Sequence, residues 1–166
     1  MSKLITKAAY VIDDNDAQKN VNMTAFVCEY AKNVLDVMYG KDIQIQCNGD
    51  VFSNYLLKIK PLSFIMMVDN IIGNAIKAAS KTLTIIIDDS KPTEYSIIFK
   101  DTGKGLDSSI KDIERLFEFG VTTTNGSGLG LYYAKKQMKE LKGSIEILPN
   151  DDVGVSIVLS WKKERK

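Results

Sequence analysis

The 166-residue sequence contains no histidine, which excludes histidine metal ligands, histidine general bases and Ser-His-Asp triads. Cysteine is scarce: Cys28 and Cys47 are the only two, and they form no CxxC pair for zinc or redox chemistry. We interpret them as two small buried thiols, one in a helical pattern and one in a strand pattern. No signal-peptide pattern follows Met1, and no apolar run approaches the ~20 residues that span a membrane. We therefore expect a chain that lies in a reducing compartment and makes no membrane contact.

The sequence also has no excess of positive or negative side chains. The 22 basic and 21 acidic residues leave a formal net charge of +1, so composition gives no reason to expect nucleic acid as a partner. The hydrophobic fraction of 45% and the charged fraction of 26% are those of a globular protein rather than a disordered one. The length suits one domain with a sizeable core.

Apolar periodicity predicts three helices, with the strands in pairs between them. The expected helices cover 24–39, 61–79 and 129–141, and the expected strands cover 43–47, 51–59, 83–88, 95–100, 144–148 and 155–161. Thr24 is the expected N-cap of the first helix, while Gly40 and Gly143 are expected to end the first and third helices. This order predicts an α+β protein, a two-layer α/β sandwich in which helices cover one face of a mixed, mostly antiparallel sheet.

Asn70, Asn74 and Lys77 share one face of the expected helix 61–79, because residues at i, i+4 and i+7 line up along a helix. Amide oxygens are hard ligands that suit Mg²⁺, and an ammonium group can meet phosphate oxygens. The face therefore suits a metal ion with phosphates, although an ordinary solvated surface has the same composition.

Asp101 directly follows the expected strand 95–100, with Gly103 and Gly105 close behind it. A buried carboxylate at a strand end can accept a hydrogen bond from an exocyclic amine and so select a base. Glycines beside it let a ligand approach the backbone. The alternative is an ordinary strand-ending turn, which uses the same residue types.

The run 126–131 (GSGLGL) leads into the last expected helix and can expose backbone N–H groups to an anion. It differs from the dinucleotide fingerprint in its glycine spacing, and no GxxxxGK[ST] loop is present. A flexible hinge is the alternative. Ahead of it, Phe117 and Phe119 flank a segment whose Thr122, Thr123 and Thr124 hydroxyls can reach phosphate; the alternative is that both rings pack on the core.

In this order and spacing, the four segments resemble the N, G1, F and G2 boxes of the Bergerat-fold ATPases. That superfamily includes DNA gyrase, a class of heat-shock chaperones and the sensor histidine kinases. The matching runs are 70–77, 101–105, 117–123 and 126–131, and the resemblance covers roughly 21–161. Gyrase-like ATPases and anti-sigma-factor serine kinases typically carry Glu where this chain has Asn70. Asn70 and Lys77 are similar to the corresponding residues of histidine kinases, whereas Thr124 replaces a Lys that is frequent in that family.

The resemblance implies an ATP site with Mg²⁺. Asp101 would read the adenine amine, Asn74 and Asn70 would hold the metal, and Asn70 and Lys77 would be the catalytic residues. Contacts to the nucleotide are implied for a longer set: Asn74, Asp101, Gly103, Gly105, Thr122, Thr123, Gly126, Ser127, Gly128, Leu129 and Gly130.

The resemblance also implies that this is the ATP-binding catalytic domain of a sensor histidine kinase. Residues 1–20 would be a linker or the stub of a preceding helical dimerisation domain, and 21–166 the catalytic domain. The acceptor histidine would lie on that separate dimerisation domain, and a response regulator receiver domain would follow in the pathway. The fragment would be monomeric and cytoplasmic, and the full-length protein would be a homodimer, either soluble or bound to the membrane.

Two alternatives stay open at this point. One is a stand-alone anti-sigma-factor-type serine kinase, and the missing Glu argues against it. The other is a non-catalytic ATP-binding sensor module, which the altered end of the F box leaves possible.

Overall fold

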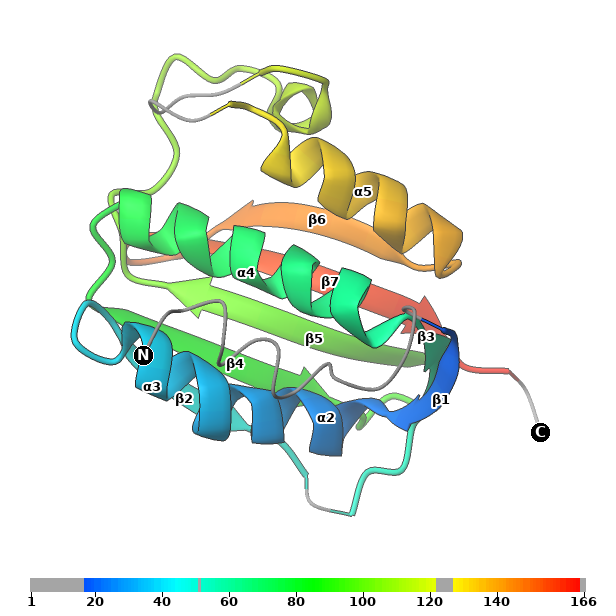
Figure 1. Ribbon diagram of the computed structural model, residues 1–166. Coiled ribbons are helices and arrows are strands. Elements are labelled where there is room, and N and C mark those ends of the chain that lie inside the picture. Colours follow the sequence, from blue (N-terminus) through cyan, green and yellow to red (C-terminus); the bar gives the residue numbers. More distant parts are fainter. Residues whose placement is uncertain (1–16, 51, 122–126, 165–166) are drawn as a thin grey trace.

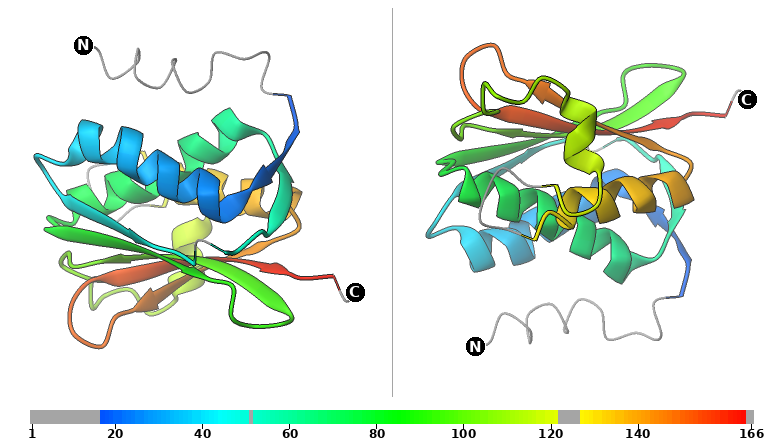
Figure 2. Two further views of the ribbon diagram at one scale, coloured as in Figure 1. Left: turned by 90° about the horizontal axis from the view of Figure 1, so that it is seen from below. Right: turned by 90° about the horizontal axis from the view of Figure 1, so that it is seen from above.

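The computed structural model describes residues 17–50, 52–121 and 127–164. A five-stranded sheet forms one layer, and helices cover one of its faces (Figures 1 and 2). Its strands, in spatial order, are β2 (Gln44–Asn48), β4 (Thr82–Asp88), β5 (Glu94–Asp101), β7 (Val155–Lys162) and β6 (Ser144–Pro149). β2 and β4 pair in parallel and every other pair is antiparallel, so the predicted mixed, mostly antiparallel α+β sandwich is confirmed.

The first helical stretch runs without a break through α2 (Met23–Tyr30), the π-helical η1 (Ala31–Leu35) and α3 (Asp36–Tyr39). Its N-cap is Asn22, whose side chain accepts a hydrogen bond from the Ala25 N–H at 3.0 Å. The prediction that Thr24 is the cap is wrong, because its hydroxyl is buried and hydrogen-bonded to Ser53. The predicted end at Gly40 is confirmed.

α4 (Pro61–Lys77) begins with proline at its first position, where the missing N–H costs nothing. Its predicted apolar stripe is largely right: Ile65, Val68, Ile72 and Ala75 are all buried. The helix ends two residues before the predicted Ala79, which has a positive φ of 58°.

α5 (Gly130–Glu140) packs beside α4 and ends in a way that the sequence did not predict. Lys142, rather than Gly143, adopts the left-handed backbone conformation, with φ 56°. Gly143 is needed for close packing, since a Cβ there would lie 2.6 Å from Met138 Cε and 2.8 Å from the Ser160 carbonyl oxygen.

A second, two-stranded sheet was not predicted in this form. β1 (Lys19–Asn22) pairs antiparallel with β3 (Leu56–Ile59), which is shorter than the predicted strand 51–59. β1 starts within the segment expected to be a linker, and it leads directly into α2.

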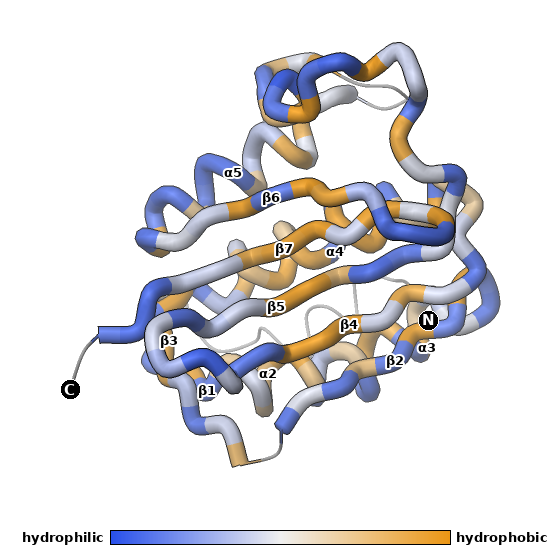
Figure 3. Tube along the Cα trace, turned by 180° about the vertical axis from the view of Figure 1, so that it is seen from behind, coloured by the Kyte–Doolittle hydropathy of each residue, from blue (hydrophilic) through white to orange (hydrophobic). Residues whose placement is uncertain are grey.

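The core lies between the main sheet and the helices. Alternate residues of β4 and β5 point into it, as period-two side chains must. They are Leu83, Ile85, Ile87, Tyr95, Ile97 and Phe99, all buried. Seen from behind, the middles of β4, β5 and β7 are hydrophobic (Figure 3). Within the described ranges, no helix is both long and apolar enough to cross a membrane.

A network of hydrogen-bonded polar side chains connects one end of the sheet to α2. The Thr24 hydroxyl is hydrogen-bonded to Ser53 Oγ at 2.9 Å and to the Tyr95 hydroxyl at 3.0 Å. Ser53 donates to Asp89 Oδ2, and Lys163 Nζ lies 2.6 Å from Asp89 Oδ1. Both charged side chains of this ion pair are about one-fifth exposed, at 19% for Asp89 and 20% for Lys163. Burial alone would raise the pKa of Asp89, but the hydrogen bonds from Lys163 and Ser53 outweigh it and hold the pKa below its ordinary value.

Replacing Asp89 by Asn should lower the free energy of unfolding at pH 7 by roughly 1–3 kcal/mol, because Lys163 loses its negatively charged partner and keeps only the backbone carbonyls of residues 89 and 91. Since the folded-state pKa of Asp89 is depressed, its contribution is complete above the unfolded-state pKa of about 4 and is lost as the pH falls through the folded-state value. Urea unfolding should therefore show a larger Asp89→Asn effect at pH 7 than at pH 3. Asp42→Asn, at an exposed carboxylate, is the control. If Asp89→Asn lowered the free energy of unfolding by the same amount at pH 7 and pH 3, the depressed pKa of Asp89 would be contradicted.

Candidate functional site

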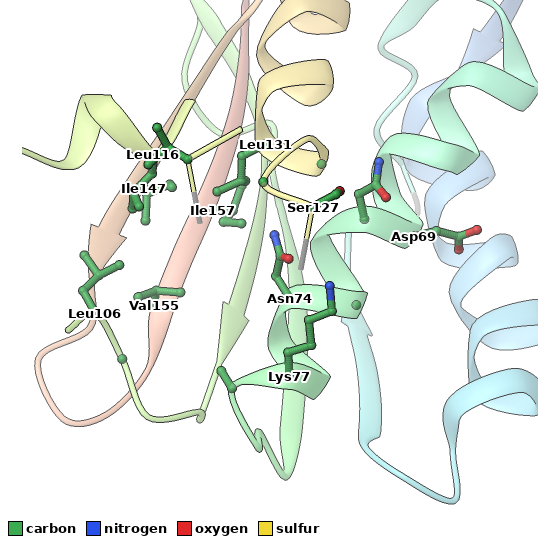
Figure 4. Close-up of a pocket in the computed structure, with 17 residues that line it drawn as sticks. Asp69, Asn74, Lys77, Leu106, Leu116, Ser127, Leu131, Ile147, Val155 and Ile157 are labelled. Atoms are coloured by element: carbon green, nitrogen blue, oxygen red, sulfur yellow. The ribbon is translucent and has the colours of Figure 1, made fainter. Parts of the chain in front are cut away.

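A cavity of about 250 Å³ opens between α4 and the ends of β6 and β7. One side is apolar and gathers side chains from β6, β7, α5 and the loops beside them (Figure 4). These residues are Leu106, Leu116, Leu131, Ile147, Val155 and Ile157. The facing side is polar and comes from α4. Such a division suits a ligand with a flat apolar part and a charged part.

Asn70, Asn74 and Lys77 form the polar side, as the helical spacing predicted. Figure 4 shows the Lys77 side chain extending along α4 toward Asn74. Lys77 is exposed and forms no ion pair with any residue in the described parts of the chain, which leaves its ammonium group available to a ligand. Asn70 and Lys77 are seven positions apart, so the polar face extends roughly 10 Å along the helix axis.

The N-terminus of α5 closes one end of the cavity. Gly130, its first residue, lies against Asn70: a Cβ there would be 3.5 Å from Asn70 Cβ. The N-cap residue, Leu129, makes no side-chain capping hydrogen bond, so the first N–H groups of α5 lack the partner that a cap would give them. Uncapped N–H groups at the positive end of a helix attract an anion.

The glycine run reaches the cavity through Ser127, Gly128 and Gly130, which all line it. Gly128 has a φ of 67°, and a Cβ on it would lie 2.5 Å from the Gly120 carbonyl carbon, so only glycine fits. Leu129 does not line the cavity, although both its neighbours do. The predicted site residues Thr122, Thr123 and Gly126, like Thr124, fall outside the described residues.

Asp101 is the last residue of β5 and is only 5% exposed. Its Oδ1 accepts hydrogen bonds from the Gly103 N–H at 2.7 Å and the Val155 N–H at 3.4 Å. No residue in the described parts of the chain donates a hydrogen bond to Oδ2. Asp101 and Gly103 themselves do not line the cavity, whereas Gly105, Ala78 and Val155 around them do. The carboxylate therefore lies directly behind the cavity wall.

Two glycines hold Asp101 in place by close approach. A Cβ on Gly103 would lie 2.7 Å from Ala78 Cβ, so the loop after β5 packs directly against the end of α4. Gly154, with a φ of 85°, approaches so closely that its Cβ would lie 2.6 Å from Asp101 Oδ1. Gly103 was predicted and Gly154 was not.

Asn150 was also missed. Its Nδ2 donates to the Asp101 carbonyl oxygen at 2.8 Å and to the Val153 carbonyl oxygen at 2.9 Å. The expected strands 144–148 and 155–161 imply a connection that contains Asn150, but its partner Asp101 lies 49 positions away, beyond the reach of local patterns.

Asp69, adjacent to Asn70, also lines the cavity, and Figure 4 shows it pointing toward the α2 side. Its Oδ1 accepts a hydrogen bond from the Tyr30 hydroxyl at 2.9 Å. Burial raises the pKa of Tyr30 and the negative charge of Asp69 adds to the effect, so the hydroxyl stays a donor at neutral pH. This bond ties α2 to the helix that carries the polar side of the cavity.

The two aromatic residues of the predicted F box behave differently from each other. Phe117, in the short 3₁₀ helix η2 (Ile113–Phe117), is buried. Phe119 is 68% exposed and makes an edge-to-face contact with Tyr132, at 5.3 Å between ring centroids. Core packing therefore explains Phe117 but not Phe119.

The donors in the cavity fit Mg²⁺ carried in with phosphates. In the described residues there is no group of three or more His, Cys, Asp or Glu side chains that could hold a metal ion alone. Asn70 and Asn74 offer amide oxygens on one helix face. Mg²⁺ commonly takes one or two protein ligands and fills its octahedron with phosphate oxygens and water.

A comparison with family models matches residues 59–165 to the histidine kinase-, DNA gyrase B- and HSP90-like ATPases. Among curated proteins, the sensor protein EvgS of Escherichia coli O157:H7 is 26% identical over 130 residues, covering 72% of this chain and 11% of EvgS. The histidine protein kinase SaeS of Staphylococcus epidermidis is 34% identical over 107 residues, covering 58% of this chain and 30% of SaeS. The match thus spans less than a third of either relative.

Solved structures show the same fold. The mycobacterial sensor histidine kinase MprB superimposes with a TM-score of 0.70 at 17% identity, covering 90% of this chain and 100% of that one. The nucleotide-free catalytic domain of histidine kinase ThkA gives a TM-score of 0.70 at 20% identity, covering 88% and 97%. The family match takes in α4 with its polar face and the end of β5, more than half of the chain. This chain therefore belongs to the histidine kinase-, DNA gyrase B- and HSP90-like ATPase family, as a histidine kinase-type ATPase domain.

Proposed function

We propose that this domain transfers the γ-phosphate of ATP to a histidine on a separate helical dimerisation domain. One observation supports the proposal: Asn70, at the position where the resemblance to gyrase-like ATPases and serine kinases implies a Glu, lies where the cavity meets α5. An amide there can orient a phosphate or a metal-bound water but cannot take a proton. The acceptor must then be nucleophilic without a base from this position, as a neutral imidazole is.

The nucleotide would lie with its base against the apolar side and Asp101, and with its phosphates toward Gly128 and the start of α5. Asp101 Oδ2 would accept the adenine amine hydrogen. Gly103, Gly105 and Leu129 would contribute backbone groups, and Ser127, Gly128 and Gly130 would surround the phosphates. Phosphoryl transfer depends mainly on positioning and on neutralising charge, which these groups supply.

Mg²⁺ would bind through the amide oxygen of Asn74, with Asn70 as a second ligand or through water. Bound there, the ion would neutralise phosphate charge and hold the triphosphate in one geometry. Lys77 would add its positive charge to the same phosphates from the end of α4. Asn70 and Lys77 are thus the residues that we assign to catalysis.

A groove between α4 and α5 offers the acceptor a route to the phosphates. It is lined by Ser63, Met66, Met67, Asn70, Tyr133, Ala134, Lys136, Gln137 and Glu140. Asn70 lines both this groove and the nucleotide cavity, so the two meet at that residue. Met66 is 55% exposed and Tyr133 is 49% exposed, which gives the groove apolar surface for an amphipathic helix.

In the whole protein, we expect the dimerisation domain to precede this one, with residues 1–20 as the connection and 21–166 as the catalytic unit. The full-length chain would then be a cytoplasmic homodimer or the cytoplasmic part of a membrane-bound sensor. Its phosphohistidine would pass the phosphoryl group to a response regulator receiver domain.

Asp101→Asn tests the adenine contact. The new side chain can keep Oδ1 for the Gly103 and Val155 N–H groups and place an NH₂ group where Oδ2 was, so only the ligand-facing atom changes. A donor would then face the adenine amine at a cost of about 1–3 kcal/mol, and ATP should bind roughly ten- to a hundredfold more weakly by calorimetry. GTP should bind poorly to the wild type. Unchanged ATP affinity in the variant would overturn this role for Asp101.

Asn74→Ala tests the metal site. Removing the amide oxygen should abolish the dependence of ATP binding on Mg²⁺ while leaving adenosine binding nearly unchanged. Asn33→Ala, at an exposed amide that does not line the cavity, is the matched control and should retain the full Mg²⁺ dependence. An equal weakening of adenosine and ATP by Asn74→Ala would mean that Asn74 supports the fold rather than the ion.

Incubation with γ-labelled ATP and Mg²⁺ tests the transfer. Alone, the chain should bind nucleotide and acquire no acid-labile phosphate, since it contains no histidine. Adding a histidine-bearing dimerisation domain from the same protein should give slow labelling of that domain, because the untethered reaction lacks an effective concentration on the order of mM. Acid-stable phosphate on this chain alone would favour the serine-kinase alternative, and binding without any transfer would favour a sensor module.

Met66→Glu separates transfer from nucleotide binding in the same assay. A charge in the groove should reduce labelling of the partner by about tenfold or more while the ATP affinity stays the same. Phe52→Glu, at a residue that is 88% exposed and outside the groove, is the control and should leave both unchanged. Equal transfer by both variants would exclude this groove as the docking surface.

A further inference from the structure

Cys28 and Cys47 come together in the fold, away from the nucleotide cavity. Cys28 lies on α2 and Cys47 on β2, which is an edge strand of the main sheet. Both thiols are free, and the prediction of one in a helix and one in a strand is confirmed. They pack against the core but are only partly buried, so the interpretation of them as buried is right only in part. Neither lines the nucleotide cavity, so the chemistry of this pair is independent of the proposed function.

The backbone places both sulfurs on the same side of the sheet. Cys47 is the register partner of Ile85, whose side chain is buried in the core under the helices. Because the strands pair in parallel with residues in register, Cys47 faces the helices too. Beyond the end of β2, a Cβ on Gly49 would lie 3.2 Å from Cys28 Sγ. The sulfur on α2 therefore sits over the last residues of β2.

The two side chains lie near enough for each to shift the pKa of the other. The interaction with Cys47 lowers the pKa of Cys28, against the opposing effect of burial. The same interaction raises the pKa of Cys47, and burial adds to that effect. Cys28 is consequently the better nucleophile at neutral pH, and Cys47 stands next to it as a second thiol.

We propose that Cys28 and Cys47 form a reversible oxidation site, which low-molecular-weight disulfides convert into an intramolecular disulfide between α2 and β2. Disulfide geometry is strict, and these thiols start close to it: Cys28 Sγ lies over the last residues of β2, and Cys47 on that strand faces the helices. The bond would join a helix directly to an edge strand that has a sheet neighbour on one side only.

The reaction proceeds in two exchanges. The Cys28 thiolate attacks one sulfur of the reagent, whose S–S bond breaks; a mixed disulfide forms on Cys28 and one reagent thiolate leaves and takes up a proton. Cys47 then loses its proton, and its sulfur attacks Cys28 Sγ and expels the second reagent thiolate, which is protonated in turn. Two protein thiols are oxidised and one reagent disulfide is reduced to two thiols.

Oxidised glutathione, applied to the folded chain at neutral pH, is the test. After acid quenching and alkylation, intact mass should show a monomer that has lost two hydrogen atoms, carries no glutathione and resists alkylation at both cysteines. Protease digestion should yield the Cys28 and Cys47 peptides joined, and dithiothreitol should separate them. The melting temperature of the oxidised protein should rise by roughly 5–10 °C, as expected for closing a loop of this size in a domain of this length.

Single serine variants assign the two roles. Cys47→Ser should stop at a stable mixed disulfide with one glutathione on Cys28. Cys28→Ser should react at Cys47 at least about tenfold more slowly, because burial still raises the pKa of that thiol after the interaction with Cys28 is removed. Circular dichroism checks that each variant is folded. The proposal fails if the wild type stays reduced, retains glutathione on both cysteines or crosslinks only between molecules, and equal rates in the two variants would refute the assignment of Cys28 as nucleophile.

Discussion

The carboxylate of Asp101 joins the end of β5 to the start of β7, 54 positions away in the sequence, and the geometry of the pocket depends on it. Oδ1 accepts N–H groups from the loop after β5 and from the start of β7. Gly103 lets the first of these segments touch the end of α4, and Gly154 lets the turn between β6 and β7 close over the carboxylate. A side chain at either glycine would push a wall of the pocket outward.

The two carboxylate oxygens of Asp101 have different surroundings. One carboxylate oxygen accepts hydrogen bonds from the protein backbone, which fixes the group, while the other accepts none from the described residues. A buried acid held in this way does not have to reorganise when a ligand arrives, so little of the binding free energy is lost to ordering it. On the far side of the cavity, the backbone of Lys77 is held in α4, so that only its side chain would have to be ordered by a ligand.

Features of the site that depend on residues close together in the sequence could be predicted, whereas those that depend on distant residues could not. The Asn70, Asn74 and Lys77 face was predictable because helical spacing is local and α4 is strongly apolar on its other side. Asn150 and Gly154 were not, because their partner Asp101 belongs to a distant strand. Local rules could not identify the N-cap of α2, because Asn22 and Thr24 are both residue types that cap helices well. The pairing of β1 with β3 decides between them, since it extends the strand up to Asn22. The burial of Cys47 was overestimated because an edge position cannot be recognised from a strand pattern.

The π-helical segment η1 has a consequence for chain length. A π turn closes i→i+5 hydrogen bonds and so holds one residue more than the α-helical turn that it replaces. Deleting one residue between 31 and 35 would return this stretch to α-helix while α2 and α3 keep their faces toward the core. The same deletion between Asn70 and Lys77 would rotate one end of the polar face by about 100° relative to the other and break up the site. The first helical stretch and α4 pack on the same face of the sheet, yet only the first can lose one residue without changing which side chains face the core.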